Sequence, residues 1–471
     1  MNKILFKGTL YLILCAIYCT PIKSQHSIIG YWEGNVTFSL GQLNMNVTFT
    51  QDKDSLKATM DIPQQNAKNL SLLNVKFNDP SVYFELGSRI GMAKYDGKLI
   101  KDTIKGKFTQ NVVEGTFVLY RVNPKDTVAE RLPYKVESVT FSNGENTFGG
   151  TLTSPETPGR HPVIVLIAGS GAHNRDEEIF GFKPFKMIAD HLTRQGFAVL
   201  RYDKRGVGES KGKTIDESTT FDFATDVEQA IKMLKTRNDI DTTKIGLLGH
   251  SEGGIIAPLV ASRNKDIAFI ILMAGTGVKG SDVMLEQKKL IMEKAGSTEK
   301  DIKKSLQSSK DIFEAIRKNK GFDKIRKEIK EEILANYPKD TSKTSNKEEK
   351  DSLINLIVEQ QMKPIQSNWF KYFIDYDPQP SLEKVTCPVL VLFGDMDVQV
   401  SSQQNQKPIT DALKKAGNKD VTVKIFPKAN HLFLTAITGN IDEYGTLEKV
   451  FVPGFLATIS EWARKRCGLS N

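Results

Sequence analysis

The stretch Gly249-His250-Ser251-Glu252-Gly253 follows the apolar run Lys244–Leu248 and decides how the second half of the chain is interpreted. When a strand turns at once into a helix, the residue in the turn is strained, so the residues two before and two after it must be small. Both glycines meet that requirement. The turn lifts the hydroxyl of Ser251 off the sheet edge, where the backbone N–H of Glu252 can face a developing oxyanion. The pattern predicts a nucleophilic serine, but taken alone it fits an ordinary glycine turn equally well.

Compact apolar runs separated by helical patterns surround this stretch from about Pro133 onward. Such runs are typical of parallel strands that are covered on both faces, and they comprise Val163–Ala168, Ala198–Tyr202, Ile245–Leu248, Ala268–Met273, Val389–Phe393 and Val421–Phe426. Between them, Phe185–Arg194 and Phe223–Lys235 carry apolar residues at helical spacing. The pattern predicts an α/β domain over residues 133–471 with a doubly wound, mostly parallel sheet. Ser251 then lies at the carboxyl ends of the strands, where ligands bind.

A nucleophilic serine needs a histidine to take its proton and a carboxylate to orient that histidine. Of the six histidines, only His431 lies just past the final predicted strand. The strand Val389–Phe393 is followed by Asp395 and Asp397, which gives the chain order serine, acid, histidine. We predict Asp397 as the acid, with Asp395 as the second choice, because the turn after Gly394 carries the later residue farther toward the site. His173 is a further candidate for lining the pocket.

Two glycine-rich stretches raise nucleotide binding as an alternative. Residues 206–214 resemble a phosphate-binding loop, but Val207 stands where that motif needs glycine, and a polar loop follows instead of a helix. Gly169-Ser170-Gly171 hints at a dinucleotide fingerprint, but Asn174 stands at the position of its third glycine. Both comparisons argue against a nucleotide site.

Several separated segments in the region from about Val136 to the C-terminus carry a family resemblance. In chain order they are Ala168-Gly169-Ser170-Gly171, Asn174-Arg175-Asp176, residues 202–210, the turn at residues 249–254, residues 369–373 and residues 397–400. They resemble the α/β-hydrolase superfamily, and more closely the exported bacterial carboxylesterases of the EstD type, which carry a β-domain before the hydrolase domain.

The resemblance implies roles for individual residues. Ser251, Asp397 and His431 take the catalytic positions, and the backbone N–H groups of Ser170 and Glu252 supply the oxyanion hole. The mechanism so implied needs no metal ion and no organic cofactor. Many relatives have histidine where this chain has Ala168, but a backbone donor does not depend on that side chain.

Residues 25–125 follow a different pattern. Short β-rich runs such as Asn46–Thr50, Val82–Leu86 and Thr116–Tyr120 alternate or nearly alternate, and turn-forming pairs separate them. This predicts a small antiparallel β-domain, and its opening residues, 30–34, resemble the first strand of lipocalin-like barrels. Side chains often fill the interior of so small a barrel. We therefore favour a packing or dimerisation module over a ligand-binding one.

An insertion at about residues 277–378 has helical character and contains abundant lysine and glutamate. A segment in this position, before the strand that carries the acid, usually caps the pocket. Its final part includes Trp369 and Phe373. These two residues are candidates for substrate binding, and a role in core packing is an equal alternative for each.

The first 24 residues are typical of an export signal. Lys3 and Lys7 precede the apolar run Thr9–Cys19, and Ile22-Lys23-Ser24 forms an acceptable cleavage site before Gln25. Cleavage would leave Cys387 and Cys467, which do not form a disulfide framework. No later stretch is long and apolar enough for a transmembrane helix. The sequence predicts an exported protein, periplasmic or secreted, without a stable membrane span.

The net charge of +9 comes from 65 basic and 56 acidic residues. Because no nucleic-acid motif accompanies the lysines, we interpret them as a solvated face rather than a nucleic-acid surface. The sequence as a whole predicts a serine carboxylesterase that hydrolyses a small-molecule ester, with a short acyl chain, through an acyl-enzyme. It leaves open a serine peptidase of the same fold, a non-catalytic protein that binds a glycan or a partner, and assembly into a homo-oligomer.

Overall fold

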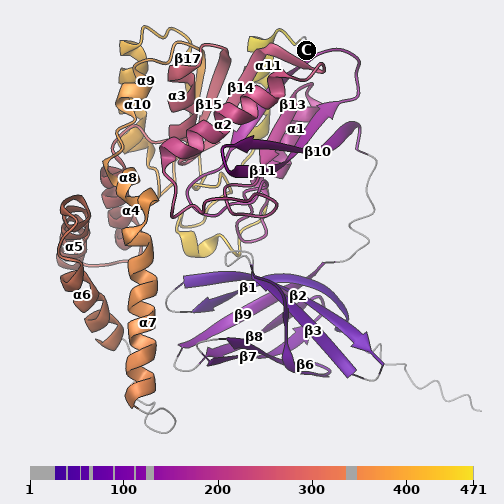
Figure 1. Cartoon of the computed structure of the whole chain (residues 1–471), viewed down its shortest axis with the longest axis vertical. Helices are drawn as coiled ribbons and strands as arrows, with labels where there is room; N and C mark the ends of the chain where they lie inside the picture. Colours follow the sequence, from indigo (N-terminus) through magenta and orange to yellow (C-terminus); the bar gives the residue numbers. More distant parts are fainter. Residues whose placement is uncertain are drawn as a thin grey trace, which may run out of the picture.

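The computed structural model describes residues 27–38, 41–53, 55–62, 67–88, 91–110, 113–122, 132–335 and 347–469. The predicted export signal, residues 1–24, lies outside the described residues. Two sheets organise the described chain, an antiparallel sheet near the N-terminus and a larger α/β unit that follows it (Figure 1).

The N-terminal sheet is a barrel-like antiparallel meander (Figure 1). Its strands are β1 (Gly30–Phe38), β2 (Gly41–Asp52), β3 (Ser55–Ile62), β4 (Ala67–Ser71), β5 (Leu73–Asn78), β6 (Ser81–Ser88), β7 (Gly91–Ile100), β8 (Thr103–Gln110) and β9 (Val113–Val122). The first strand pairs with both β2 and the last strand, so β4 and β5 form the two ends of the sheet. The predicted antiparallel β-domain is therefore present.

Side chains fill the interior of this β-domain. Alternate residues of β7 are buried, as the period of two along a strand requires. Phe84 stacks on Tyr95 with ring centroids 4.7 Å apart, and Phe117 meets both rings edge-on. Trp32 is fully buried among them and donates from Nε1 to the carbonyl of Ile28. The interior is thus an apolar core.

The second sheet has the strand order β10-β11-β13-β12-β14-β15-β16-β17. Its strands are β10 (Tyr134–Asn143), β11 (Asn146–Pro155), β12 (His161–Ile167), β13 (Ala198–Tyr202), β14 (Ile240–His250), β15 (Ile267–Met273), β16 (Val389–Gly394) and β17 (Val421–Phe426). The strands from β12 to β17 pair in parallel, and their apolar runs are mostly buried on both faces. β10 and β11 form an antiparallel edge hairpin that the apolar runs did not identify.

Helices cover both faces of this sheet. One face carries α1 (Pro184–Arg194) and α11 (Phe455–Cys467), and the other carries α2 (Thr220–Lys235), α3 (Gly253–Arg263), α9 (Gln379–Leu382) and α10 (Ser402–Lys415). A capping box starts α2, because the Thr219 hydroxyl accepts from the N–H of Asp222 and the Asp222 carboxylate accepts from the N–H of Thr219. A short 3-10 helix, η3 (Ile441–Glu443), follows β17.

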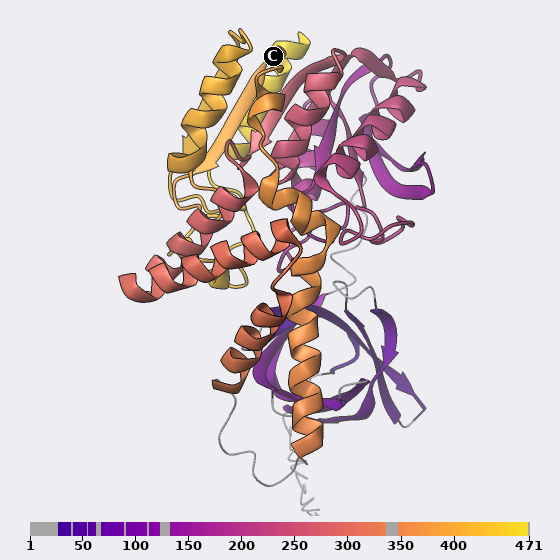
Figure 2. The same ribbon diagram turned by 60° about the vertical axis from the view of Figure 1, so that its left-hand side comes forward.

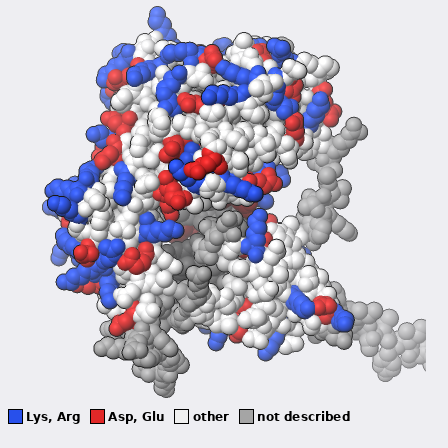
Figure 3. Space-filling view, in the orientation of Figure 1, with Lys and Arg blue, Asp and Glu red and all other residues white. Residues whose placement is uncertain are grey.

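The insertion forms a helical cap between β15 and β16. It contains α4 (Gly280–Lys294), α5 (Glu299–Lys318), α6 (Phe322–Ala335), α7 (Lys347–Gln366) and α8 (Asn368–Asp375). Figures 1 and 2 show α7 running from the α/β unit past the level of the β-domain. Many of the Lys and Arg side chains gather on the cap, at the left of Figure 3. None of the helices in the described residues combines the length and the apolar composition that a membrane-spanning helix requires.

Candidate active site

Ser251 occupies a sharp turn between β14 and α3. Its backbone φ is +54°, in the left-handed region that costs a side-chain-bearing residue energy. The two neighbouring glycines make the turn feasible, since a Cβ at Gly249 would lie 1.9 Å from the carbonyl oxygen of Gly253, and a Cβ at Gly253 would lie 2.0 Å from that of Ile167. The serine is thus held at the carboxyl end of β14, beside the point where the chain switches from one side of β12 to the other.

His431 and Asp397 meet next to this turn, after β17 and β16. The Nδ1–H of His431 donates to Asp397 Oδ2 at 2.8 Å. The other carboxylate oxygen accepts from the backbone N–H groups of Gln399 and Val400, at 2.7 and 2.9 Å. Asp397 is buried, whereas Asp395 is exposed. A hydrogen bond at Nδ1 leaves Nε2 of His431 as the acceptor that could take a proton.

The loop after β12 lies against the serine. A Cβ placed on Gly169 would be 3.2 Å from the Cβ of Ser251. Within the described part of the chain, the backbone N–H groups of Ser170 and Glu252 donate to no protein acceptor. Two such donors beside a serine hydroxyl have the arrangement that an oxyanion hole requires.

A cavity of about 300 Å³ joins these groups. Ser251, His431 and Ser170 line it, together with the predicted pocket residues His173, Trp369 and Phe373. We call it the inner cavity. Much of the remaining wall is apolar and comes from the cap and from the loop after β17: Val283, Met284, Leu432 and Ile441. The structure therefore gathers all the site residues that the sequence analysis named, apart from Asp397, which stands behind His431.

Sequence analysis assigned no role to a second buried pair beside this site. His250 donates from Nδ1 to Glu177 Oε1 at 2.9 Å and from Nε2 to the backbone carbonyl of His431 at 3.0 Å. Its ring lies 4.7 Å from that of His431. The same Glu177 oxygen accepts from the N–H of Gly169 at 2.6 Å. The pair thus ties the loop after β12, which holds Gly169, to the loop after β17, which holds His431.

The protonation state of this pair follows from its contacts. Burial would lower the pKa of His250, but the charge and hydrogen bond of Glu177 raise it overall. Burial likewise opposes ionisation of Glu177, and the charge of His250 lowers its pKa overall. Because both ring nitrogens of His250 face acceptors, the doubly protonated cation fits the site.

The side chain of Glu252 was also missed, because the sequence drew attention to its backbone only. Its carboxylate is fully buried and accepts from Thr220 Oγ1 and from Trp369 Nε1, both at 2.8 Å. Lys204 Nζ lies 3.4 Å from its other oxygen and donates to the carbonyl of Gly169 at 2.7 Å. Through this hydrogen bond to Trp369, Glu252, which directly follows Ser251, anchors the cap helix α8.

A network of polar side chains stabilises the loop after β12. Asp203 accepts from the backbone N–H and the guanidinium of Arg175 and from the N–H of Glu209. Arg205 forms paired hydrogen bonds with Asp226 on α2. The segments of the family resemblance at residues 174–176 and 202–210 therefore hold the loops after β12 and β13 together. Arg205 fixes the second loop to α2.

Comparison with known protein families gives the assignment. The family model described as serine aminopeptidase, S33 matches residues 181–436, which is more than half of the chain. The chain belongs to this family. This match confirms the resemblance to α/β hydrolases that the sequence motifs indicated.

The individual relatives share only a low sequence identity with this chain. The esterase EstD of Thermotoga maritima is 26% identical over 314 residues, which cover 64% of this chain and 63% of that relative. The chain therefore matches less than two thirds of the length of that relative. Two solved structures are also similar to this chain. A Pyrococcus furiosus esterase is 15% identical, with a TM-score of 0.43, and the match covers 74% of this chain and 94% of the esterase. Est1E of Butyrivibrio proteoclasticus with ferulic acid is 17% identical, with a TM-score of 0.39, and the match covers 69% of this chain and 96% of Est1E.

The Glu177–His250 pair should make the stability of this family member depend on pH. The pKa of His250 is raised above 6.5, so its contribution is fully present below pH 6.5 and is lost as the pH rises through the raised pKa. The pKa of Glu177 is lowered below 4.5, so its contribution is lost only as the pH falls through the lowered pKa. Thermal midpoints of the wild type and a Glu177→Gln/His250→Gln variant should differ most at about pH 5 to 6, and the difference should shrink as the pH rises through the raised pKa of His250. A difference that is constant over this range would contradict the ion pair.

Removing the indole donor from the cap should alter substrate use. Trp369→Phe keeps the ring but leaves Glu252 without one hydrogen bond, so we expect a loss of about 1–3 kcal/mol in stability and a fall of about 10-fold in kcat/KM. Trp462→Phe is the matched control, because that indole also loses one hydrogen bond, to Thr422, but lies outside the residues that line the inner cavity. Equal kinetic effects of the two substitutions would count against the anchoring role.

Proposed function

We propose that the chain is an exported serine carboxylesterase that hydrolyses short-chain esters of small molecules through an acyl-enzyme. The observation that carries the proposal is the Asp397–His431 hydrogen bond at the wall of the small cavity that Ser251 also lines. The family match and the relative named as an esterase support a hydrolase of this kind.

In the proposed reaction, His431 Nε2 takes the proton of Ser251 as its Oγ attacks the ester carbonyl carbon. The N–H groups of Ser170 and Glu252 stabilise the oxyanion that forms. The bond to the alcohol oxygen then breaks, and that oxygen receives the proton from His431. Water, activated by the same histidine, releases the carboxylic acid and restores the serine. Asp397 holds the histidine in the required tautomer throughout.

An aminopeptidase is the second candidate, because the family is described by that activity. Such an enzyme needs a free carboxylate near the site to bind the substrate's α-ammonium group. Among the described residues, the carboxylates that line the inner cavity belong to Glu177 and Glu252. The first is bonded to His250 and Gly169, and the second to Thr220, Trp369 and Lys204. Because both carboxylates already have partners, the inner cavity itself favours the esterase.

The size of the inner cavity supports short acyl chains. At about 300 Å³ it lies at the lower limit of the volumes found for ligand pockets. Its apolar wall suits a small acyl group, whereas a long chain would have to leave the cavity. Export is proposed from residues 1–24 alone, in which a charged segment, an apolar segment and a cleavage site follow the order of a signal peptide.

A substrate panel tests the proposal. Purified protein should cleave p-nitrophenyl acetate and butyrate with a kcat/KM at least about 10-fold above that for the decanoate. The reason is that the inner cavity is too small for the whole decanoyl chain, so that chain binds less favourably in the transition state. Aminoacyl p-nitroanilides should be cleaved far more slowly. Efficient anilide cleavage with little ester cleavage would replace the esterase by the aminopeptidase.

A further inference from the structure

A second cavity of about 920 Å³ lies between the β-domain and the α/β unit. We call it the outer cavity. Ser170, His173, Ile179 and Phe180 line both cavities, so the two lie side by side. A molecule held in the outer cavity therefore contacts the β-domain on one side and the loop beside Ser251 on the other.

The β-domain supplies a polar wall to the outer cavity. Glu33 stands opposite Asn46 of β2 on one side and opposite Tyr120 of β9 on the other, and Asn35 stands opposite Asn44. These residues all line the cavity. They alternate with the buried residues of the barrel core, so they lie on its outer face. In Figure 1, β1 lies at the top of the β-domain, toward the α/β unit.

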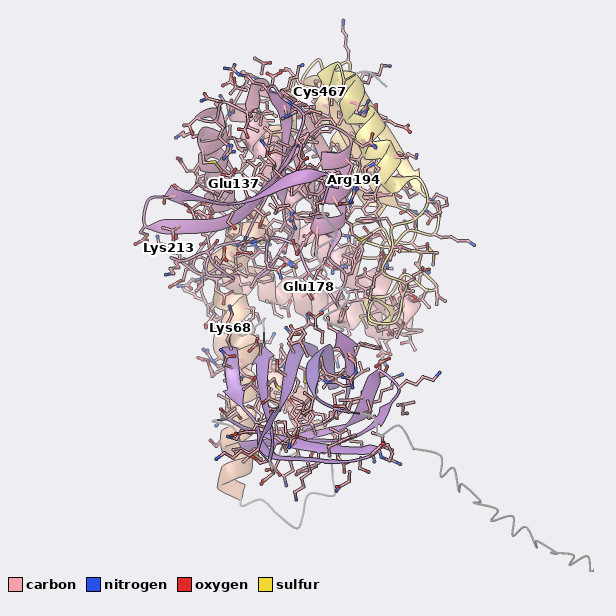
Figure 4. The ribbon with its side chains drawn as sticks, turned by 90° about the vertical axis from the view of Figure 1, so that its right-hand side faces the viewer. Lys68, Glu137, Glu178, Arg194, Lys213 and Cys467 are labelled. Atoms are coloured by element: carbon pink, nitrogen blue, oxygen red, sulfur yellow. The ribbon has the colours of Figure 1, made fainter. Side chains whose placement is uncertain are left out.

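The opposite wall belongs to the α/β unit. Asn174, Glu178 and Lys449 line it, with the ring of Phe180 beside them. Figure 4 shows Glu178 at the edge of this unit that faces the β-domain. Burial raises the pKa of Glu178, Lys183 lowers it, and Glu33 raises it further, with a net rise. Glu33 and Glu178 both line the outer cavity, one from each wall.

The two cavities differ in chemistry. The outer one offers amides, carboxylates and an ammonium group, which together can accept and donate hydrogen bonds in many directions. It also offers the aromatic rings of Tyr120 and Phe180, against which the apolar face of a sugar ring can pack. A hydrocarbon chain would exclude water from these polar groups without offering them a hydrogen bond, which is unfavourable. A polyhydroxylated molecule would satisfy them.

We propose that the outer cavity binds the sugar portion of an acylated carbohydrate, while its short acyl group enters the inner cavity. The inference rests on the proposed function and names its substrate class. In the reaction, the ester bond between the acyl carbon and the sugar oxygen breaks, the sugar oxygen takes the proton from His431, and the acyl group passes to Ser251 and then to water. The β-domain is thus the part of the enzyme that selects the alcohol.

The first test compares hydrolysis of two esters. Wild-type protein and an Asn35→Ala/Asn46→Ala variant are assayed on acetylated xylo-oligosaccharides and on p-nitrophenyl acetate. Loss of two hydrogen-bonding side chains should lower the preference for the sugar ester, as a ratio of kcat/KM values, by about 10-fold, mainly through KM. Asn78→Ala is the matched control, an exposed asparagine on β5 that does not line the cavity. An unchanged ratio would overturn the proposal.

The second test measures binding without chemistry. Calorimetry with unacylated xylotriose, cellotriose and chitotriose should detect at least one of them binding to the wild type, and about 10-fold more weakly to the double variant. Binding of none, or equal binding by both proteins, would overturn the sugar site. If p-nitrophenyl esters are still cleaved in that case, the proposed esterase stands. If a sugar binds but no ester is cleaved, the sugar site stands and the proposed esterase fails.

Discussion

Replacing Ser251 by alanine is expected to lower kcat for p-nitrophenyl acetate by about 10⁴- to 10⁶-fold. The expected loss is this large because the serine oxygen forms the covalent bond to the acyl group in the proposed mechanism. The fold should persist, since alanine removes only an oxygen from a turn whose strain the surrounding glycines already accommodate. Steady-state kinetics together with far-UV circular dichroism would measure both effects.

Ser262→Ala is the matched control. Ser262 lies on α3, the helix that follows the turn, and its hydroxyl only donates to the carbonyl of Leu259. That variant should retain activity within about twofold, because a local hydrogen bond of this kind contributes only about 1 kcal/mol to stability. Residual activity of Ser251→Ala near the wild-type level would remove Ser251 from the mechanism.

The second large effect is expected at the acid. Asp397→Asn should lower kcat by about 10³- to 10⁴-fold, because an amide at this position no longer fixes His431 with its proton on Nδ1. Asp395→Asn, two residues away, should change kcat by less than about threefold, since that side chain is exposed. The two variants differ by one atom each and share a turn, so their comparison isolates the hydrogen bond to His431. A severe loss in Asp395→Asn alone would reverse the assignment.

The parts of the fold that the sequence predicted are those with strong local signals. The strands of the parallel sheet are continuous apolar runs because both of their faces are buried, and the turn at Ser251 requires glycine at two fixed positions. The edge hairpin β10–β11 was missed because neither strand is an apolar run. Most of β10 faces solvent, and β11 is mostly buried but consists largely of Gly, Thr, Ser and Asn.

The groups that the sequence did not reveal owe their roles to distant partners. His250 meets Glu177 from a loop 73 positions earlier, and Glu252 meets Trp369 from a helix 117 positions later. Nothing in the local pattern of either segment identifies the other. The polar wall on β1, β2 and β9 is a similar case, because alternation predicts that one face is polar but not that it faces a cavity.

Covalent labelling of the intact protein tests the central claim most directly. A fluorophosphonate reacts with an activated serine, and peptide mass spectrometry then locates the modified residue. We expect one adduct per chain, on the peptide that contains Ser251, and strongly reduced labelling in Asp397→Asn. Labelling that persists in Ser251→Ala, or an adduct on a different residue, would contradict Ser251 as the nucleophile.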